Sequence, residues 1–200
     1  MNALCNISVF EDYIKRLNLA INMIPLPLIS KLSDALIDCH NHGRQIFICG
    51  NGGSAGNAIH LANDLMYGVA KKTGCGIKAI ALPSNQSIIT CLANDVGYAN
   101  IFSEQLALYA NSDDLLLVLS GSGNSSNIIN ALIMSKSKKM KSFAILGYSG
   151  GACMEYADEA LHIPVNDMQI SEDIQLIIGH MIMQRLSFKF QGTYEVDQPI

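Results

Sequence analysis

The stretch QIFICGNGGS, residues 45–54, joins a short apolar run to a glycine-rich loop and decides the fold. The run over residues 45–49 lacks polar alternation, which is typical of a strand covered on both faces of a parallel sheet. A helical pattern follows over residues 55–69, so the loop 50–54 lies between a strand and a helix N-terminus. Glycines let a backbone approach a ligand, and the unpaired N–H groups of a helix N-terminus favour an anion. The loop therefore predicts a phosphate site at the end of a parallel strand.

The same alternation of apolar runs and helical patterns continues along the chain. Further short apolar runs lie at residues 77–82, 115–119, 142–146 and 160–163. Helical patterns lie between them, at residues 87–110, 125–138 and, as one short turn, 151–156. Strand–helix alternation of this kind predicts a doubly wound α/β fold with a parallel sheet.

Both ends of the chain are predicted to be helical. Apolar spacing over residues 8–24 and 28–42, with Pro25 and Pro27 between them, predicts an N-terminal helical hairpin. A long helix is expected over residues 172–190. We expect a single domain over residues 1–190, followed by a flexible polar tail over residues 191–200.

Composition limits the class of protein. Half of the residues are apolar and 15% are charged, against about 25% in typical soluble domains, which favours a homo-oligomer with buried surface. A net charge of −4 without a basic run argues against nucleic-acid binding. No apolar stretch reaches the roughly 20 residues of a membrane span, and the first residues do not resemble a signal peptide. The six cysteines include no CxxC pair, which indicates buried thiols in a reducing cytoplasm.

Two further loops have the composition of a ligand site. The loop SGSGNSS, residues 120–126, follows the third predicted strand and opens a helix, with hydroxyls but no lysine or arginine. Neither this loop nor 50–54 matches GxxxxGK[ST] or GxGxxG, which disfavours a nucleotide. Either loop alone is equally well a tight turn with a serine N-cap, but two loops at equivalent strand ends favour a phosphate site. The loop 93–98, with Asn94 and Asp95, is either a turn or a set of partners for sugar hydroxyls.

Histidines and carboxylates occur at helical spacing. His60 and Asp64 share one helix face, so they can ligate a divalent metal or transfer a proton, although such pairs are more often surface contacts. His180 lies among apolar residues, where a histidine is more often part of the core. Glu172 lies on a similar face but about 12 Å away along the axis, so one ion joins both only if Glu172 bends inward.

This ordered set of motifs resembles the sugar isomerase (SIS) domain family, in its phosphoheptose isomerase branch. The residues that carry the resemblance are CGNGGS at 49–54, His60, Asn94-Asp95, SGSGNS at 120–125 and His180. The resemblance implies a three-layer fold with a five-stranded parallel sheet, assembled as a homotetramer in the cytoplasm with sites near subunit interfaces. It implies isomerisation of sedoheptulose 7-phosphate to D-glycero-D-manno-heptose 7-phosphate through an enediol, for activated-heptose biosynthesis toward lipopolysaccharide or capsule.

The resemblance also implies roles for individual residues. Asp64 and His180 match an acid/base pair that is catalytic in the family. The ligands of one divalent ion per site, zinc in the family, match His60, Asp64, Glu172 and His180. The substrate contacts match Asn51, Gly52, Gly53, Ser54, Asn94, Asp95, Ser120, Gly121, Ser122, Ser125 and Glu172. No nucleotide cofactor is implied.

The chain departs from the usual family pattern at several positions. Asp64 stands where the family usually has Glu, Glu172 where it has Gln, and Gly121 where it has Thr, while an arginine is replaced around Tyr67-Gly68. The alternative hypothesis is a non-catalytic SIS tetramer, an adaptor that binds the bacterial replication initiator. The retained histidines favour the enzyme. A sugar-phosphate sensing module is a third possibility, but such modules are usually fused to a DNA-binding domain.

Overall fold

The structure, a computed structural model, describes residues 3–191, and side chains from residue 7 onward. Its five strands form one parallel sheet in the order β2-β1-β3-β4-β5, which confirms the predicted architecture. The strands are β1 (Ile46–Gly50), β2 (Ala79–Ala81), β3 (Leu115–Ser120), β4 (Lys141–Leu146) and β5 (Glu159–His162). Most of the predicted flexible tail, residues 192–200, lies outside the described residues.

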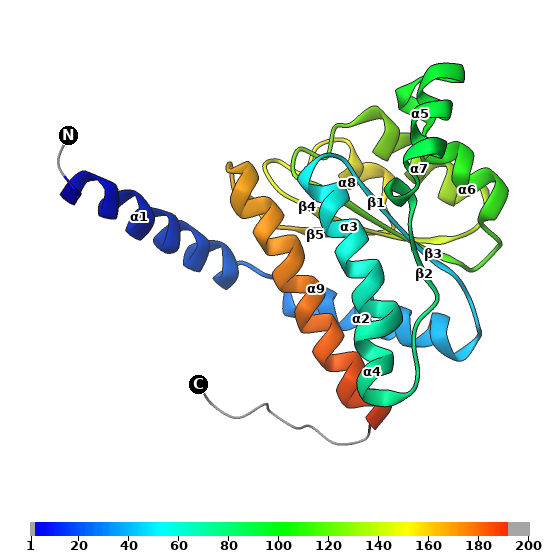
Figure 1. The fold of residues 1–200 in the computed structure, drawn as a ribbon, viewed down its shortest axis with the longest axis horizontal. Helices are drawn as coiled ribbons and strands as arrows, with labels where there is room; N and C mark the ends of the chain where they lie inside the picture. The colour runs from blue at the N-terminus through cyan, green and yellow to red at the C-terminus, as the bar shows by residue number, and fades with distance from the viewer. Residues whose placement is uncertain (1–2, 192–200) are drawn as a thin grey trace.

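Helices cover both faces of the sheet, as Figure 1 shows. Alternate residues of β1 enter two separate cores, with Ile46 and Ile48 on one face and Phe47 and Cys49 on the other. One face is covered by α2 (Leu26–Asn41), α3 (Gly53–Asn63) and α9 (Met168–Gln191). The other is covered by α6 (Ser103–Tyr109), α7 (Ser126–Ser137) and α8 (Cys153–Tyr156). Burial on both faces explains why the strands lack polar alternation.

The strand order places a topological switch point between β1 and β3. These strands are neighbours, with Gly50 aligned to Leu119. The helix that follows β1, α3, covers one face, while the helix that follows β3, α7, covers the other. Neighbouring strands whose chains leave toward opposite faces form a switch point, where ligands bind in doubly wound sheets. The loops 50–54 and 120–125 both lie at this point.

Two helices precede the sheet, as predicted, and they bend by 69° at the break near Pro25. The first, α1 (Ala3–Asn22), projects away from the body of the molecule, while α2 packs under the sheet (Figure 1). Among the described residues, no single helix is both long and apolar enough to span a bilayer. Only the bent pair of segments, Ile7–Asn22 with Leu26–Asn41, meets that test, by length and composition.

Short elements complete the chain between β1 and β3. A helix over Val69–Thr73, α4, leads toward β2. The region predicted as helical over 87–110 divides into α5 (Gln86–Asp95), a 3₁₀ turn over Tyr98–Asn100, and α6. No residue of α5 is buried, so this helix stands on the surface above the sheet (Figure 1).

The buried cysteines have a packing role. Cys49 in β1 and Cys153 in α8 are fully buried in one core. Burial raises the pKa of the Cys49 thiol and raises the pKa of Cys153 to about 11. Both thiols therefore stay protonated and unreactive near neutral pH, as expected for structural cysteines.

Candidate active site

His60, Asp64 and His180 form one cluster where α3 meets α9. The two histidine Nε2 atoms lie 3.0 Å apart, and Asp64 Oδ2 lies 3.2 Å from His60 Nε2 and 3.5 Å from His180 Nε2. Asp64 is largely buried, whereas both histidine side chains are about half exposed. The fold therefore joins an isolated helical pair to a histidine far along the chain, and leaves the cluster open to a ligand.

A glycine lets the two helices approach closely enough to form the cluster. A Cβ added at Gly179 would lie 2.1 Å from Leu61 Cδ2, so the Leu61 side chain occupies the space of the missing side chain. Gly179 precedes His180, and Leu61 follows His60. The close contact between Gly179 and Leu61 therefore brings the two imidazoles together.

Buried amides hold the N-terminal half of α3 against α9. Asn57 Nδ2 donates to the carbonyl oxygen of Glu172 and to Gln175 Oε1, both at 2.9 Å. Gln175 Nε2 in turn donates to Ser54 Oγ at 3.0 Å, and both of these side chains are buried. Ser54, a predicted substrate contact, thus uses its hydroxyl oxygen to join two helices.

The helix that carries Asp64 changes its geometry at that residue. A π-helical turn spans Asp64–Gly68, and Val69 N–H donates to the carbonyl oxygen of Asp64. Outside the helix, Ile77 N–H donates to the carbonyl oxygen of Leu65 at 3.0 Å. Such turns are rare and occur frequently at functional sites. The π turn sets the direction in which Asp64 leaves the helix, and the sequence pattern, which predicted one continuous helix, did not reveal it.

The cluster has the donor atoms and spacing of a zinc site. Two imidazole nitrogens and a carboxylate oxygen are ligands that zinc prefers. Around a tetrahedral zinc with bonds of about 2.0–2.1 Å, neighbouring ligand atoms lie about 3.3 Å apart. The observed separations of 3.0, 3.2 and 3.5 Å bracket that value. His60, Asp64 and His180 therefore fit one divalent ion, in the pattern of three protein ligands and one further position that catalytic zinc sites share.

Glu172, the fourth predicted ligand, is not brought into this cluster. It lies two turns before His180 on α9, which is about 12 Å along a helix axis. Its carboxylate instead lies against the loop after β1, where a Cβ on Gly53 would meet Glu172 Oε2 at 2.2 Å. The structure thus separates a metal-type cluster of three residues from a carboxylate at the N-terminus of α3.

The loop after β1 has the geometry of an anion site. Gly52 is the N-cap of α3 with φ of 57°, a conformation that favours glycine, and no atom lies near the position of a Cβ. Gly53 and Ser54 form the first turn of α3, where backbone N–H groups lack helical partners. These N–H groups are suited to bind a phosphate.

The loop after β3 is ordered by its own serines. Ser120 Oγ accepts a hydrogen bond from Gly123 N–H at 3.0 Å, and Ser122 Oγ accepts one from Asn124 N–H at 3.3 Å. Ser125 is the N-cap residue of α7 but its side chain makes no capping hydrogen bond. Its hydroxyl is therefore available to a ligand at this helix N-terminus.

Glycines also allow this loop to pack against the turn after β4. A Cβ on Gly123 would lie 1.9 Å from the carbonyl oxygen of Gly150, and one on Gly151 would lie 2.5 Å from that of Ser122. Gly123 has φ of 66°. The backbone contacts leave no room for a side chain at either position.

Replacing Gly123 with alanine is expected to raise KM for a sugar phosphate on the order of 10-fold, because a strained, displaced loop costs about 1–3 kcal/mol. The control is Gly74→Ala at the C-cap of α4, where φ is 73° but nothing lies within 4 Å of a Cβ. Steady-state kinetics on both variants measure the difference. Equal KM values in the two variants would contradict the role of the loop.

The absence of a side chain at position 121 is explained by the packing of Met168, on α9, against Gly121. A Cβ at Gly121 would lie 2.6 Å from Met168 Sδ. The Met168 side chain thus fills the volume that a larger residue at position 121 would need. Gly121, where the family usually has threonine, therefore occurs together with Met168, whose side chain occupies the space of a side chain at position 121.

Asn51 is held by residues that the sequence analysis did not single out. It exchanges hydrogen bonds of 2.8 Å with Asn127, and its Oδ1 also accepts one from Tyr98 Oη at 2.9 Å. Asn127 belongs to α7, and Tyr98 follows α5. Asn51 therefore connects the loop after β1 to α7 and to the turn after α5, and the signal that the sequence offered for Asn127 was a polar residue beside Ile128 and Ile129 at the start of a helix.

Asn94 and Asp95 lie at the exposed C-terminal end of α5. Asn94 Nδ2 donates to Asp95 Oδ1 at 2.8 Å, and Asp95 Oδ2 accepts from Cys91 Sγ at 3.4 Å. The hydrogen bond to Asp95 raises the pKa of the Cys91 thiol. The polar contacts described for this pair are local to α5.

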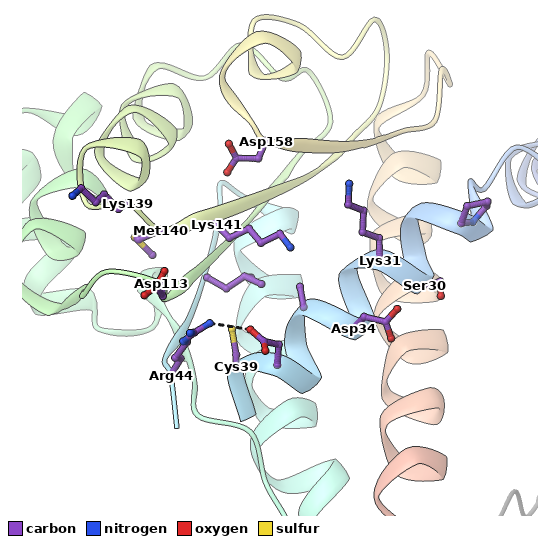
Figure 2. Close-up of a pocket in the computed structure, with 14 residues that line it drawn as sticks. Ser30, Lys31, Asp34, Cys39, Arg44, Asp113, Lys139, Met140, Lys141 and Asp158 are labelled. Carbon is purple, nitrogen blue, oxygen red and sulfur yellow. Dashed lines mark hydrogen bonds and ion pairs between the residues drawn. The ribbon is translucent and has the colours of Figure 1, made fainter. Parts of the chain in front are cut away.

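A separate cavity of about 620 Å³ lies at the amino ends of the strands, between α2 and the start of β3 and β4 (Figure 2). Its acidic residues have partners: Asp38 pairs with Arg44 at 2.9 Å, and Asp158 Oδ2 accepts from Ser142 Oγ at 2.8 Å. Ligands of parallel sheets bind at the carboxyl ends of strands, so this cavity is not the candidate active site.

The family model of the SIS domain matches residues 10–147, and the chain therefore belongs to the SIS domain family. Among its relatives, the phosphoheptose isomerase of Aliarcobacter butzleri is 36% identical over 156 residues, which cover 78% of this chain and 82% of that protein. The phosphoheptose isomerase of Glaesserella parasuis is 36% identical over 165 residues, covering 82% of this chain and 85% of that protein.

A solved structure agrees with this assignment. The phosphoheptose isomerase from Francisella tularensis superposes with a TM-score of 0.85 at 31% identity, covering 94% of this chain and 99% of that one. The similarity thus extends beyond the residues that the family model matches, into α9.

Proposed function

We propose that this protein is an aldose–ketose isomerase that interconverts sedoheptulose 7-phosphate and D-glycero-D-manno-heptose 7-phosphate. The observation that carries the proposal is the cluster of His60, Asp64 and His180, which forms where α3 meets α9. The reaction is the one named for its relatives, which resemble it over most of their length.

The proposed reaction moves one proton between two neighbouring carbons. A base removes a proton from C1 of the ketose, the C–H electrons form the C1=C2 bond, and the C2 oxygen gains a proton to give an enediol. The O1 hydroxyl then loses its proton to form the C1 carbonyl, and the C1=C2 electrons take up a proton at C2, which gives the aldose. Asp64 and His180, whose side chains lie 3.5 Å apart, are the two groups, one acting as base and the other as acid.

Zinc is the divalent ion that we propose for the cluster, held by His60, Asp64 and His180. When bound, the ion would polarise the carbonyl and stabilise the enediolate charge. With the ion held through Asp64 Oδ2 and the two histidine Nε2 atoms, the atoms left to carry the proton are the second carboxylate oxygen of Asp64 and Nδ1 of His180. Glu172 contributes in this proposal as a substrate contact beside Gly53 rather than as a fourth ligand.

The loops hold the other end of the substrate. The N–H groups of Gly52, Gly53 and Ser54 and the hydroxyls of Ser122 and Ser125 are proposed to bind the phosphate and nearby sugar hydroxyls. Asn51 contributes an amide fixed by its neighbours. Binding energy gained at this distant end then positions the reacting carbons. Further contacts are proposed for Ser120, Gly121, Asn94 and Asp95.

Incubation with sedoheptulose 7-phosphate tests the proposal directly. We expect the aldose 7-phosphate to appear and to approach equilibrium from either side, and a chelator to lower the rate. Metal analysis of the purified protein is expected to find one divalent ion per chain. A protein that contains the metal but forms no aldose product would contradict the proposed reaction.

The adaptor alternative predicts a different outcome of the same experiment. A non-catalytic tetramer has no need for an acid/base cluster with zinc-like spacing, which favours the enzyme. Binding of the replication initiator without isomerase activity would instead favour the adaptor.

We further propose that the chain forms a homotetramer in the cytoplasm and supplies activated heptose for lipopolysaccharide or capsule. Support for assembly comes from α1, which exposes large apolar side chains along one face. Phe10 is 67% exposed, and Ile14 is 57% exposed. An apolar face of this kind favours burial against another copy.

Replacing Ile14 with glutamate is expected to shift the molar mass in light scattering from a tetramer to a smaller species. A charge inside an apolar interface costs several kcal/mol, which is enough to dissociate it. The matched control is Leu108→Glu on α6, whose side chain is 83% exposed. An unchanged mass for Ile14→Glu would contradict the assignment of α1 to the interface.

A further inference from the structure

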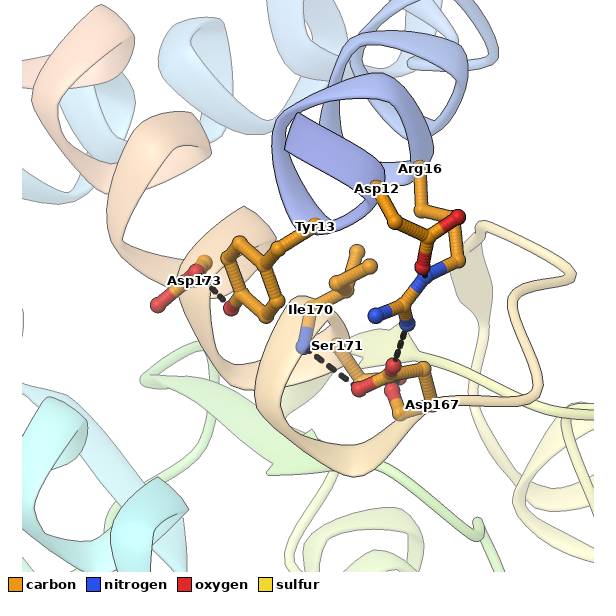
Figure 3. A network of polar contacts seen from close by, with 7 residues as sticks. All are labelled: Asp12, Tyr13, Arg16, Asp167, Ile170, Ser171 and Asp173. Carbon is orange, nitrogen blue, oxygen red and sulfur yellow. Dashed lines mark hydrogen bonds and ion pairs between the residues drawn. The ribbon is translucent and has the colours of Figure 1, made fainter. Parts of the chain in front are cut away.

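The first turn of α9 is held from outside by α1. Tyr13 Oη donates a hydrogen bond to Asp173 Oδ2 at 2.5 Å, and Arg16 Nη1 donates to Asp167 Oδ2. Arg16 is itself oriented by Asp12, which accepts from Arg16 Nε at 2.8 Å. Figure 3 shows the tyrosine reaching Asp173 and the arginine reaching Asp167, at the two ends of the segment 167–173.

The turn between these two contacts touches both ligand loops. Met168 fills the space beside Gly121 of the loop after β3. Ser171 fills the space beside Gly147, where a Cβ would lie 2.3 Å from Ser171 Oγ. Glu172 lies against Gly53 of the loop after β1. Residues 168–172 thus contact both loops, and the Glu172 carboxylate lies beside the loop after β1.

We propose that Tyr13 and Arg16 are positioning residues for catalysis, which fix the first turn of α9 and thereby the Glu172 carboxylate against the sugar-phosphate loops. The proposal rests on the proposed function for its substrate, but the contacts themselves are independent of the reaction. It gives α1 a second role, because the Tyr13–Arg16 face acts on the chain's own site while Phe10 and Ile14 remain exposed.

The protonation states of Tyr13 and Asp167 keep both contacts formed near neutral pH. The hydrogen bond to Asp173 and burial raise the pKa of Tyr13 to about 12, so its hydroxyl remains a donor over the whole physiological range. The backbone N–H of Ile170 and the Arg16 guanidinium lower the pKa of Asp167, which stays ionised. Asp167 also accepts from Ile170 N–H at 3.1 Å, so the residue that receives Arg16 is the one that caps α9.

The ion pair of Arg16 with Asp167 is too exposed to matter mainly for stability. The Arg16 side chain is 41% exposed, and exposed ion pairs contribute little to folding. Their effect is therefore expected on geometry, where a displacement of about 1 Å can lower a rate substantially. A positioning role and a purely structural role can be separated by kinetics.

The experiment compares Tyr13→Phe, Arg16→Gln and the double variant with the full-length wild type. We expect kcat/KM for sedoheptulose 7-phosphate to fall about 10-fold in each single variant, with metal content unchanged, because His180 lies two turns further along α9. Backbone amides 168–173 are expected to exchange hydrogen faster in all three. Asp167→Asn keeps the helix cap but weakens the Arg16 contact, so Arg16→Gln is expected to add little to it.

The matched control is Arg185→Gln, which breaks the contact between Arg185 and Asp34 of α2 at the other end of α9, 2.6 Å in length. It is expected to change kcat/KM by less than about 2-fold. The inference would be overturned if Tyr13→Phe and Arg16→Gln had a lower melting temperature but the same kinetics as the wild type. An inactive wild type would overturn the proposed function instead, and hydrogen exchange at 168–173 would then decide the positioning role.

Discussion

Replacing Asp64 with asparagine is expected to lower kcat/KM for sedoheptulose 7-phosphate by about 10²–10⁴-fold, the usual contribution of a positioned acid or base. Asparagine has the shape of aspartate, so the π turn and the packing of α3 should remain. The amide cannot accept the proton that a carboxylate accepts, and it is a poorer ligand for a divalent ion. Initial rates of aldose formation and metal content per chain measure both effects.

The chain offers a matched control on another helix. Asp38 and His42 of α2 are also four residues apart and lie 3.1 Å from each other, but they are exposed and have no second histidine. Asp38→Asn is expected to leave the rate and the metal content unchanged. Full activity in Asp64→Asn, or the same loss in both variants, would contradict the assignment of Asp64. His180→Ala should resemble Asp64→Asn, because the two groups share one proton transfer.

The fold could be predicted from the sequence because its signals are local. Five short apolar runs without alternation became five parallel strands, of which β1 and β3 are buried along their whole length. The helices between them followed from apolar spacing. The phosphate loops were also visible, because Gly52 and Gly123 adopt positive φ at strand ends, where glycine is the favoured residue.

The candidate site could be predicted less completely, because its remaining parts depend on contacts between distant segments. In the sequence, His180 could be either a core histidine or a metal ligand. Only the packing of α9 beside α3 brings it next to His60 and Asp64. Glu172 was expected to join the metal, but the separation of two helical turns leaves it beside Gly53. Gln175 and Asn57 looked like ordinary helix residues, and only the packing of α3 on α9 reveals why their amides are buried or half-buried together.

The two substitutions near the site illustrate the same limit. Gly121 appeared as a loss of one side chain from the phosphate loop, whereas the structure shows Met168 in the vacated volume. Asp64 appeared as a carboxylate one methylene too short. In the structure, its oxygen still reaches both histidines, because α3 and α9 are close and the π turn begins at Asp64. In both cases the structural feature that compensates for the substitution involves another segment of the chain, so the substituted residue alone does not reveal it.

Replacing Gly179 with alanine is the second change with a large expected effect. The added Cβ would lie 2.1 Å from Leu61 Cδ2 and within 3.2 Å of two other Leu61 carbons, so α9 must move away from α3 or Leu61 must leave its rotamer. Because Leu61 is buried in the core, another rotamer is disfavoured and we expect α9 to move, which separates His180 from His60 and Asp64. We expect metal affinity and kcat/KM each to fall at least about 10-fold, since overpacking costs typically 1–3 kcal/mol. Metal titration and initial rates measure the two losses.

A second substitution should reverse this effect if the cause is steric. Leu61→Ala removes the atoms that the new Cβ would meet, so Gly179→Ala combined with Leu61→Ala is expected to regain metal binding and most of the activity. The double variant should still be less stable than the wild type, because a buried leucine replaced by alanine costs about 2–5 kcal/mol. Gly56→Ala on α3, where nothing lies within 4 Å of a Cβ, controls for alanine in a helix and should retain the metal. A double variant as inactive as Gly179→Ala would mean that helix separation is not what disables the cluster, since only the contact between Leu61 and position 179 connects the two changes.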